Sequence, residues 1–110
     1  MNTLDRALRL KLIEPAQPVR VSMGGSFTVT VQVVTTRVTE CKMHLAFDAT
    51  FVEDISGKSD PRHLHGEERI TQEVSWRLRA KSATRQTFIT VEGHAEGIFQ
   101  QVEFPLEVTQ

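Results

Sequence analysis

The chain has 110 residues, a length that suits one domain, and its apolar and charged fractions of 39% and 25% are close to the globular average. The formal net charge is −1, with both signs spread along the chain, which disfavours a nucleic-acid-binding protein because such proteins need a basic surface. Cys41 is the one cysteine, so no disulfide can form within the chain and the fold must depend on packing.

The first residues are not expected to form a signal peptide, and no membrane span is expected. The first six residues contain no apolar core of the kind found in signal peptides, and no stretch approaches the roughly 20 apolar residues of a membrane span. We therefore expect residues 1–110 to form one domain that is either cytosolic or cut from a longer secreted chain. The sequence does not distinguish these two compartments.

The first extended segment alternates apolar and polar residues and is interrupted by two prolines. Its apolar residues and prolines are Leu8, Leu10, Leu12, Pro15, Pro18, Val19 and Val21. Because proline cannot donate to a β-ladder, this pattern predicts an edge strand with a kink, at which the chain passes from one sheet to another. A helix over residues 3–13 would also place Leu4, Leu8 and Leu12 on one face, but the strict alternation and the prolines favour a strand.

Alternation with a period of two continues through the rest of the chain. It covers residues 27–33, 41–47, 51–55, 70–80, 89–95 and 102–108, separated by turn residues such as Gly24-Gly25 and Glu96-Gly97. Strands at spacings of roughly 10 to 15 residues predict an antiparallel, immunoglobulin-like β-sandwich of seven or eight strands with Greek-key connections. The expected core comprises Leu10, Val29, Val31, Met43, Leu45, Val74, Trp76, Leu78, Ile89, Val91, Phe104 and Leu106.

Three parts of the sequence resemble a broad group of bacterial domains. They are the turn and strand over residues 24–33, the segment 64–68 followed by the strand 74–80, and the closing strands 89–95 and 102–108. Together they resemble the cell-adhesion-related bacterial immunoglobulin-like domains and the similar NEW3 domains that accompany glycosidase and protease modules. The resemblance implies a non-catalytic sandwich in a larger assembly. The chain departs from the pattern at Thr35-Thr36, where the group has an asparagine, and at His65, where it has a proline.

Two histidines form a candidate metal site. His63 and His65 are two residues apart, so on a strand both imidazoles point to the same side and could bind Zn²⁺ or Cu²⁺. A third ligand would come from Asp60 or Glu67. The competing interpretation is a solvated polar loop, which we favour because no cysteine or further histidine lies nearby in the sequence. We expect no cofactor.

Cys41 and Trp76 both fall on the inward side of their predicted strands. A buried cysteine acts as a small hydrophobic residue, and a nucleophile would need a cationic, partly exposed setting that His44, on the opposite strand face, does not supply. Trp76 is expected at the centre of the core. With no tyrosine and a single tryptophan, the aromatic platform that commonly stacks on sugars is missing, and carbohydrate binding is disfavoured.

Three residues are candidates for contact with a protein partner. Arg77 and Arg79 share one strand face and could bind a carboxylate, although such faces are usually only solvated. Phe99 follows the predicted turn at Glu96-Gly97, where an exposed apolar residue could contact a partner, although single exposed hydrophobic residues are common. We therefore favour a non-enzymatic protein-interaction or spacer module, with an accessory ligand- or metal-binding domain of a multidomain enzyme as the alternative.

Overall fold

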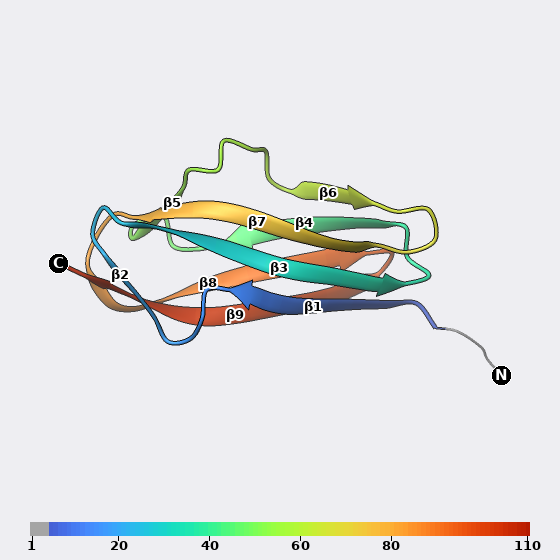
Figure 1. The fold of residues 1–110 in the computed structure, drawn as a ribbon, viewed down its shortest axis with the longest axis horizontal. Helices are drawn as coiled ribbons and strands as arrows, with labels where there is room; N and C mark the ends of the chain where they lie inside the picture. Colours follow the sequence, from blue (N-terminus) through green and yellow to red (C-terminus); the bar gives the residue numbers. More distant parts are fainter. Residues whose placement is uncertain (1–4) are drawn as a thin grey trace.

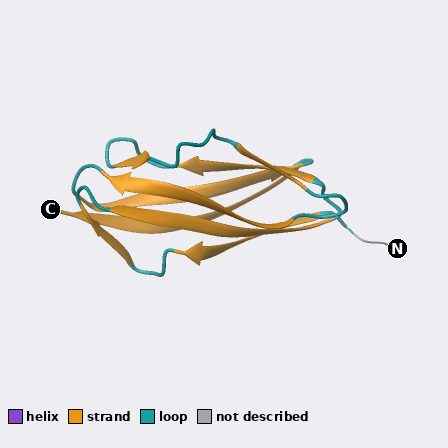
Figure 2. Cartoon of the chain, turned by 45° about the horizontal axis from the view of Figure 1, so that its top comes forward, coloured by secondary structure: helices purple, strands orange, loops and turns teal. Residues whose placement is uncertain are grey.

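The computed structural model describes residues 5–110, in which two β-sheets pack face to face and no helix occurs (Figures 1 and 2). The strands are β1 (Ala7–Glu14), β2 (Val19–Ser22), β3 (Ser26–Thr36), β4 (Glu40–Ala46), β5 (Val52–Asp54), β6 (Arg62–His65), β7 (Thr71–Ala80), β8 (Thr84–Ala95) and β9 (Ile98–Thr109). The four-stranded sheet has the order β1-β3-β7-β5, and the five-stranded sheet has the order β2-β9-β8-β4-β6. Within residues 5–110 there is no helix that could span a membrane.

The predicted β-sandwich is confirmed, with nine strands instead of seven or eight. The difference arises at the sheet edges. β5 and β6 have only three and four residues, which is too short for a clear alternation, and the prolines divide the first extended segment into two strands. Short edge strands are common in natural sheets because they limit pairing with other chains.

The N-terminal segment contributes one strand to each sheet. β1 pairs with β3 in the four-stranded sheet, and β2 pairs in parallel with β9 in the five-stranded sheet. Pro15 and Pro18 lie between β1 and β2, so the predicted change of sheet at the prolines is confirmed. Ala7–Glu14 is a strand and not a helix; residues 3 and 4 of the helical alternative, Leu4 among them, lie outside the described residues.

The core lies between the inner faces of the two sheets. Trp76, Phe104 and Met43 are its largest fully buried side chains. Every predicted core residue is buried except Leu10, which is half-buried and packs against the core while Leu8 is buried in its place. β1 is the edge strand of its sheet, so its inward residues are covered to different extents along the strand.

Thr35 joins the end of β3 to the start of β7. Its side chain is 1% exposed. The Thr35 hydroxyl donates a hydrogen bond to the Val38 carbonyl oxygen at 2.8 Å and accepts one from the Ile70 main-chain N–H at 2.7 Å. A buried main-chain group without a partner is costly, so this one hydroxyl satisfies both groups where the chain turns. The bacterial domains that this sequence resembles have an asparagine at this end of the strand. Here a threonine, Thr35, pairs the main-chain groups instead.

Candidate functional site

The five-stranded sheet carries a hollow at the end where β4 and β8 part. The two strands are paired from Lys42 to Ala46, whereas before Lys42 the strand β4 continues beside β6 alone. The gap between β4, β6 and the β8–β9 turn has a volume of about 560 Å³. We call it the hairpin hollow, and it is lined by residues 40–42, 63–65 and 94–99.

The β8–β9 hairpin places Phe99 at the hollow. Ala95 pairs with Ile98, and the two residues between them, Glu96 and Gly97, both have positive φ, at 44° and 86°. Such two-residue loops match the right-handed twist of the flanking strands and bring them together tightly. The register then sets Phe99 opposite His94, with 4.8 Å between the ring centroids. The side chain of Phe99 is 49% exposed, as expected for a residue at a strand start beside the turn.

β6 places His63 and His65 at the opposite side of the hollow. The strand pairs with β4 so that His63 lies opposite Lys42 and His65 opposite Glu40. Its end is held by a hydrogen bond from the Gly66 N–H to the Thr39 carbonyl oxygen. A Cβ atom at Gly66 would lie 2.0 Å from the main-chain oxygen of Arg69, so the turn that positions this strand requires glycine here. Both histidines are exposed.

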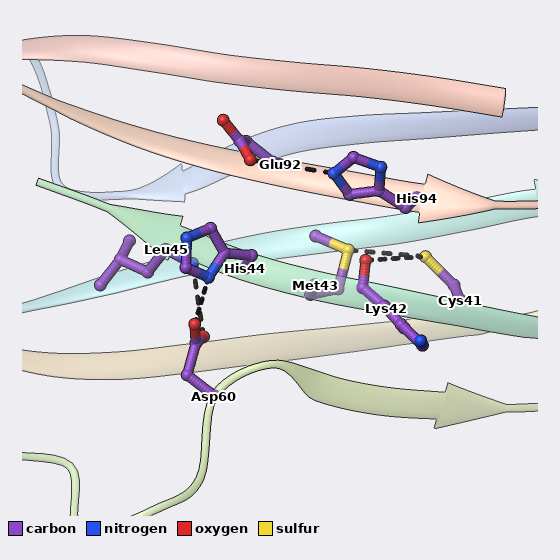
Figure 3. Close-up of polar contacts among 8 residues, drawn as sticks. All are labelled: Cys41, Lys42, Met43, His44, Leu45, Asp60, Glu92 and His94. Atoms are coloured by element: carbon purple, nitrogen blue, oxygen red, sulfur yellow. Dashed lines mark hydrogen bonds and ion pairs between the residues drawn. The ribbon is translucent and has the colours of Figure 1, made fainter.

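The structure brings a third histidine, His94, to the hollow, but it supplies no complete metal site. Among residues 5–110, no group of three or more His, Cys, Asp and Glu side chains could hold a metal ion. Asp60, one of the two expected third ligands, contacts Nδ1 of His44 instead, and His94 lies 3.8 Å from a Glu92 carboxylate oxygen (Figure 3). The metal site at His63 and His65 therefore stays a prediction, and these two histidines are the ligands it has.

Cys41 lies at the base of the hollow with its side chain directed into the core. The residue is 3% exposed, and its Sγ lies 3.6 Å from Sδ of Met43 (Figure 3). Burial raises the pKa of the thiol above its ordinary value of 9.0, and a hydrogen bond with the His94 main chain opposes this only in part. A raised pKa leaves little thiolate at neutral pH, so this setting suits a packing residue and not a nucleophile.

We expect Cys41 to make stability fall at alkaline pH. The folded-state pKa is raised, so the unfolded thiol ionises first, and the stability present below pH 9 is lost as the pH rises through the folded-state pKa. Urea unfolding at pH 8 and pH 10.5 should show a smaller fall for Cys41→Ala than for the wild type. An equal fall in both proteins would contradict this assignment. The chain has no tyrosine, which removes one competing titration.

The structure separates Arg77 and Arg79 from the hollow. Both lie on β7, on the exposed face of the other sheet, and each is occupied by neighbours. The Arg77 guanidinium donates to the hydroxyls of Ser26 and Thr28 at 2.7 and 3.1 Å, and Arg79 forms an ion pair with Glu53 at 2.7 Å. Among the predicted site residues, the structure thus groups His63, His65 and Phe99 and leaves the arginines apart.

Sequence reasoning missed Arg62. In β6 it alternates with His63, so when the histidines point outward Arg62 points inward, where its guanidinium lies 5.0 Å from the centre of the Trp76 ring. Its Nε and Nη2 atoms are buried and form no hydrogen bond with any residue in the range 5–110. The signal was available, because an outward His-x-His pair on a strand requires the residue before it to face inward.

Solved structures with a similar arrangement include two streptococcal proteins. The BIgI domain of the β protein from S. agalactiae, in complex with CEACAM1, is 12% identical, with a TM-score of 0.51 over 94% of this chain and 97% of that one. A mutant of the SrpA adhesin from Streptococcus sanguinis is 10% identical, with a TM-score of 0.50 over 98% of this chain and 59% of that one. The chain has an immunoglobulin-like fold. No protein-family model matches it, and no curated protein matches its sequence.

Proposed function

We propose that this chain is a non-enzymatic protein-interaction or spacer module of a larger protein or assembly, and that a protein partner binds over the hairpin hollow. The observation that carries the proposal is the position of Phe99, an aromatic side chain that is 49% exposed and lines the hollow. Aromatic residues beside a depression contribute a large share of the binding energy in many protein interfaces.

The residues around Phe99 form a polar rim of mixed charge. Lys42 and three histidines line the hollow together with Glu40 and Glu96. An apolar anchor within a polar rim is the usual anatomy of a protein–protein contact, and charges of both signs favour recognition of a particular partner over nonspecific adhesion.

The family resemblance and the fold both support this proposal. The motifs resemble those of cell-adhesion-related bacterial immunoglobulin-like domains and NEW3 domains, and we infer that residues 1–110 act as one such domain. The BIgI domain, which has a similar fold, is bound to CEACAM1, which illustrates that a sandwich of this kind can present a protein-binding surface.

Phe99→Ala should weaken binding of the partner by at least about tenfold, the effect typical of losing an aromatic anchor. The partner is identified by affinity purification of the tagged native protein from its source, and its Kd is then measured with purified components. Phe88→Ala is the matched control, because Phe88 is 46% exposed on β8, the strand paired with that of Phe99, but lies opposite Pro105, outside the hollow.

Equal binding by the wild type and Phe99→Ala would remove the hollow as the contact. A larger loss for Phe88→Ala would move the interface along the same sheet face. If no partner of any kind can be found for the native protein, the spacer function replaces the interaction function.

A further inference from the structure

The four-stranded sheet has an open edge along the first half of β7. β5 pairs with β7 only from Leu78 to Ala80, and just beyond this pairing the Arg77 carbonyl oxygen accepts from the Ile55 N–H while the Arg77 N–H donates to Oγ of Ser56. Among residues 5–110, the segment from Thr71 to Ser75 then has a neighbouring strand on the β3 side alone.

The open edge presents main-chain hydrogen-bonding groups. In an antiparallel ladder the N–H and C=O of one residue point to the same side, and the side alternates along the strand. Arg77 directs both groups toward β5 and the loop after it, so Ser75 and Glu73 direct theirs to the same side, where the strand neighbour has ended. An edge of this kind is a template for an added strand.

A groove of about 590 Å³ runs along this edge, between β7 and β6. β6 is itself the edge of the other sheet, and the Gln72 side-chain amide reaches the His65 carbonyl oxygen at 3.4 Å, which links the two strands at one end. The sandwich is therefore open along a seam where both sheets end, and the groove in this seam is lined by residues 58, 59, 61–64 and 73–75.

Arg62 makes the groove suited to a negatively charged group. Its guanidinium lies against Trp76, and its Nε and Nη2 are buried without a hydrogen-bond partner among the described residues. Arg62 as a whole is half-buried, but a buried N–H group without a hydrogen-bond partner is unfavourable. Lys58 also lines the groove, and Glu73, the one carboxylate in the lining, forms no ion pair with Arg62. The groove thus lacks an anion at the point where its buried donors lie.

We propose that this groove binds an extended acidic segment of a partner protein, which adds a strand to the free edge of β7 and places an Asp or Glu carboxylate on Arg62. The main-chain groups of Glu73 and Ser75 supply the strand pairing, and Arg62 selects a side chain that can accept two charged N–H bonds. This inference rests on the proposed function as a protein-interaction module and adds the chemistry of the partner and a second contact surface.

The test begins with selection of binders from a displayed library of random eleven-residue peptides, using the intact chain. The selected peptides are expected to carry an acidic residue within an extended, β-branched context. Replacing that residue by its amide should weaken binding by about tenfold or more, the fold-change expected for a hydrogen bond to a charged group. In Arg62→Met, which keeps the apolar stem on Trp76, the acidic and amide peptides should bind equally.

Glu73→Pro tests the strand pairing. Proline is tolerated where the N–H faces an open edge, so this variant should fold while losing about tenfold in peptide affinity. Glu73→Ala, which keeps the N–H, is the matched control and should bind as the wild type does. Independently of any variant, the wild-type amide protons of Glu73 and Ser75 should gain protection from hydrogen exchange when the peptide binds.

Several outcomes would overturn the inference. These are failure to select any peptide, selected peptides without an acidic preference, or unchanged amide exchange at Glu73 and Ser75. Self-association that Glu73→Pro abolishes would identify a second copy of the chain as the occupant. If the native partner binds Glu73→Pro normally but does not bind Phe99→Ala, this inference fails while the proposed function stands. If the native protein binds no partner at all, both this inference and the proposed interaction function fail.

Discussion

Replacing Trp76 by alanine is expected to lower the free energy of unfolding by about 3–5 kcal/mol, the range for truncating a buried tryptophan. The residue is 1% exposed at the centre of the sandwich and also contacts the half-buried Arg62 guanidinium. For a domain of this size the thermal midpoint would fall by roughly 4–8 °C per kcal/mol. Because Trp76 is the sole tryptophan, unfolding by guanidinium is best followed by circular dichroism instead of fluorescence.

Trp76→Phe is the informative companion to this variant. The indole Nε1 is buried without a hydrogen-bond partner among residues 5–110, so phenylalanine removes an unpaired donor while keeping an aromatic ring against Arg62. We expect its loss of stability to be clearly smaller than that of Trp76→Ala. A loss below about 1 kcal/mol for alanine would show that Trp76 does not organise the core. Equal, larger losses for the two variants would show that the smaller phenylalanine ring cannot replace the indole.

Thr35→Val is expected to cost about 2–4 kcal/mol, because it removes the hydroxyl that serves both the Ile70 N–H and the Val38 carbonyl and leaves two buried groups unpaired. The two side chains have nearly the same shape, so packing changes little and the loss reports the hydrogen bonds. Urea unfolding of the purified variant measures it directly.

The neighbouring threonine supplies the control. Thr36 is exposed at the end of the same strand, and Thr36→Val should change stability by no more than about 0.5 kcal/mol. Equal effects at the two positions would mean that the buried bridge contributes nothing beyond the β-propensity of the strand end.

Most of the sandwich could be predicted because its central strands obey a strict alternation. In β7, the inward set from Val74 to Ala80 is buried and the residues between are exposed, so the period alone gives both the strand and its face. The period does not reveal where a strand lies in its sheet. Leu8 and Leu10 share one face of β1, yet only Leu8 is fully buried, because their cover depends on distant segments.

The candidate site was less predictable, because it arises from the ends of strands that are far apart in the sequence. The turn at Glu96-Gly97 and the exposure of Phe99 follow from local chemistry, and both are found in the structure. Phe99, His63 and His65 line one hollow because β4 leaves β8 before Lys42, which no local pattern encodes. Arg62 was missed because the inward face of a strand is recognised from its apolar residues, and a charged residue on that face does not fit this alternation.

The membership of the N-terminal segment in both sheets has a mechanical consequence. β1 begins at one end of the long axis and β9 finishes at the other (Figure 1), so tension between these ends runs along the strands. β2 and β9 are parallel, and pulling them from their outer ends slides one past the other and loads all their hydrogen bonds together. Opening a hairpin would break its bonds one after another. Pulling at these two ends therefore loads two pairings in shear, that of β1 with β3 and that of β2 with β9.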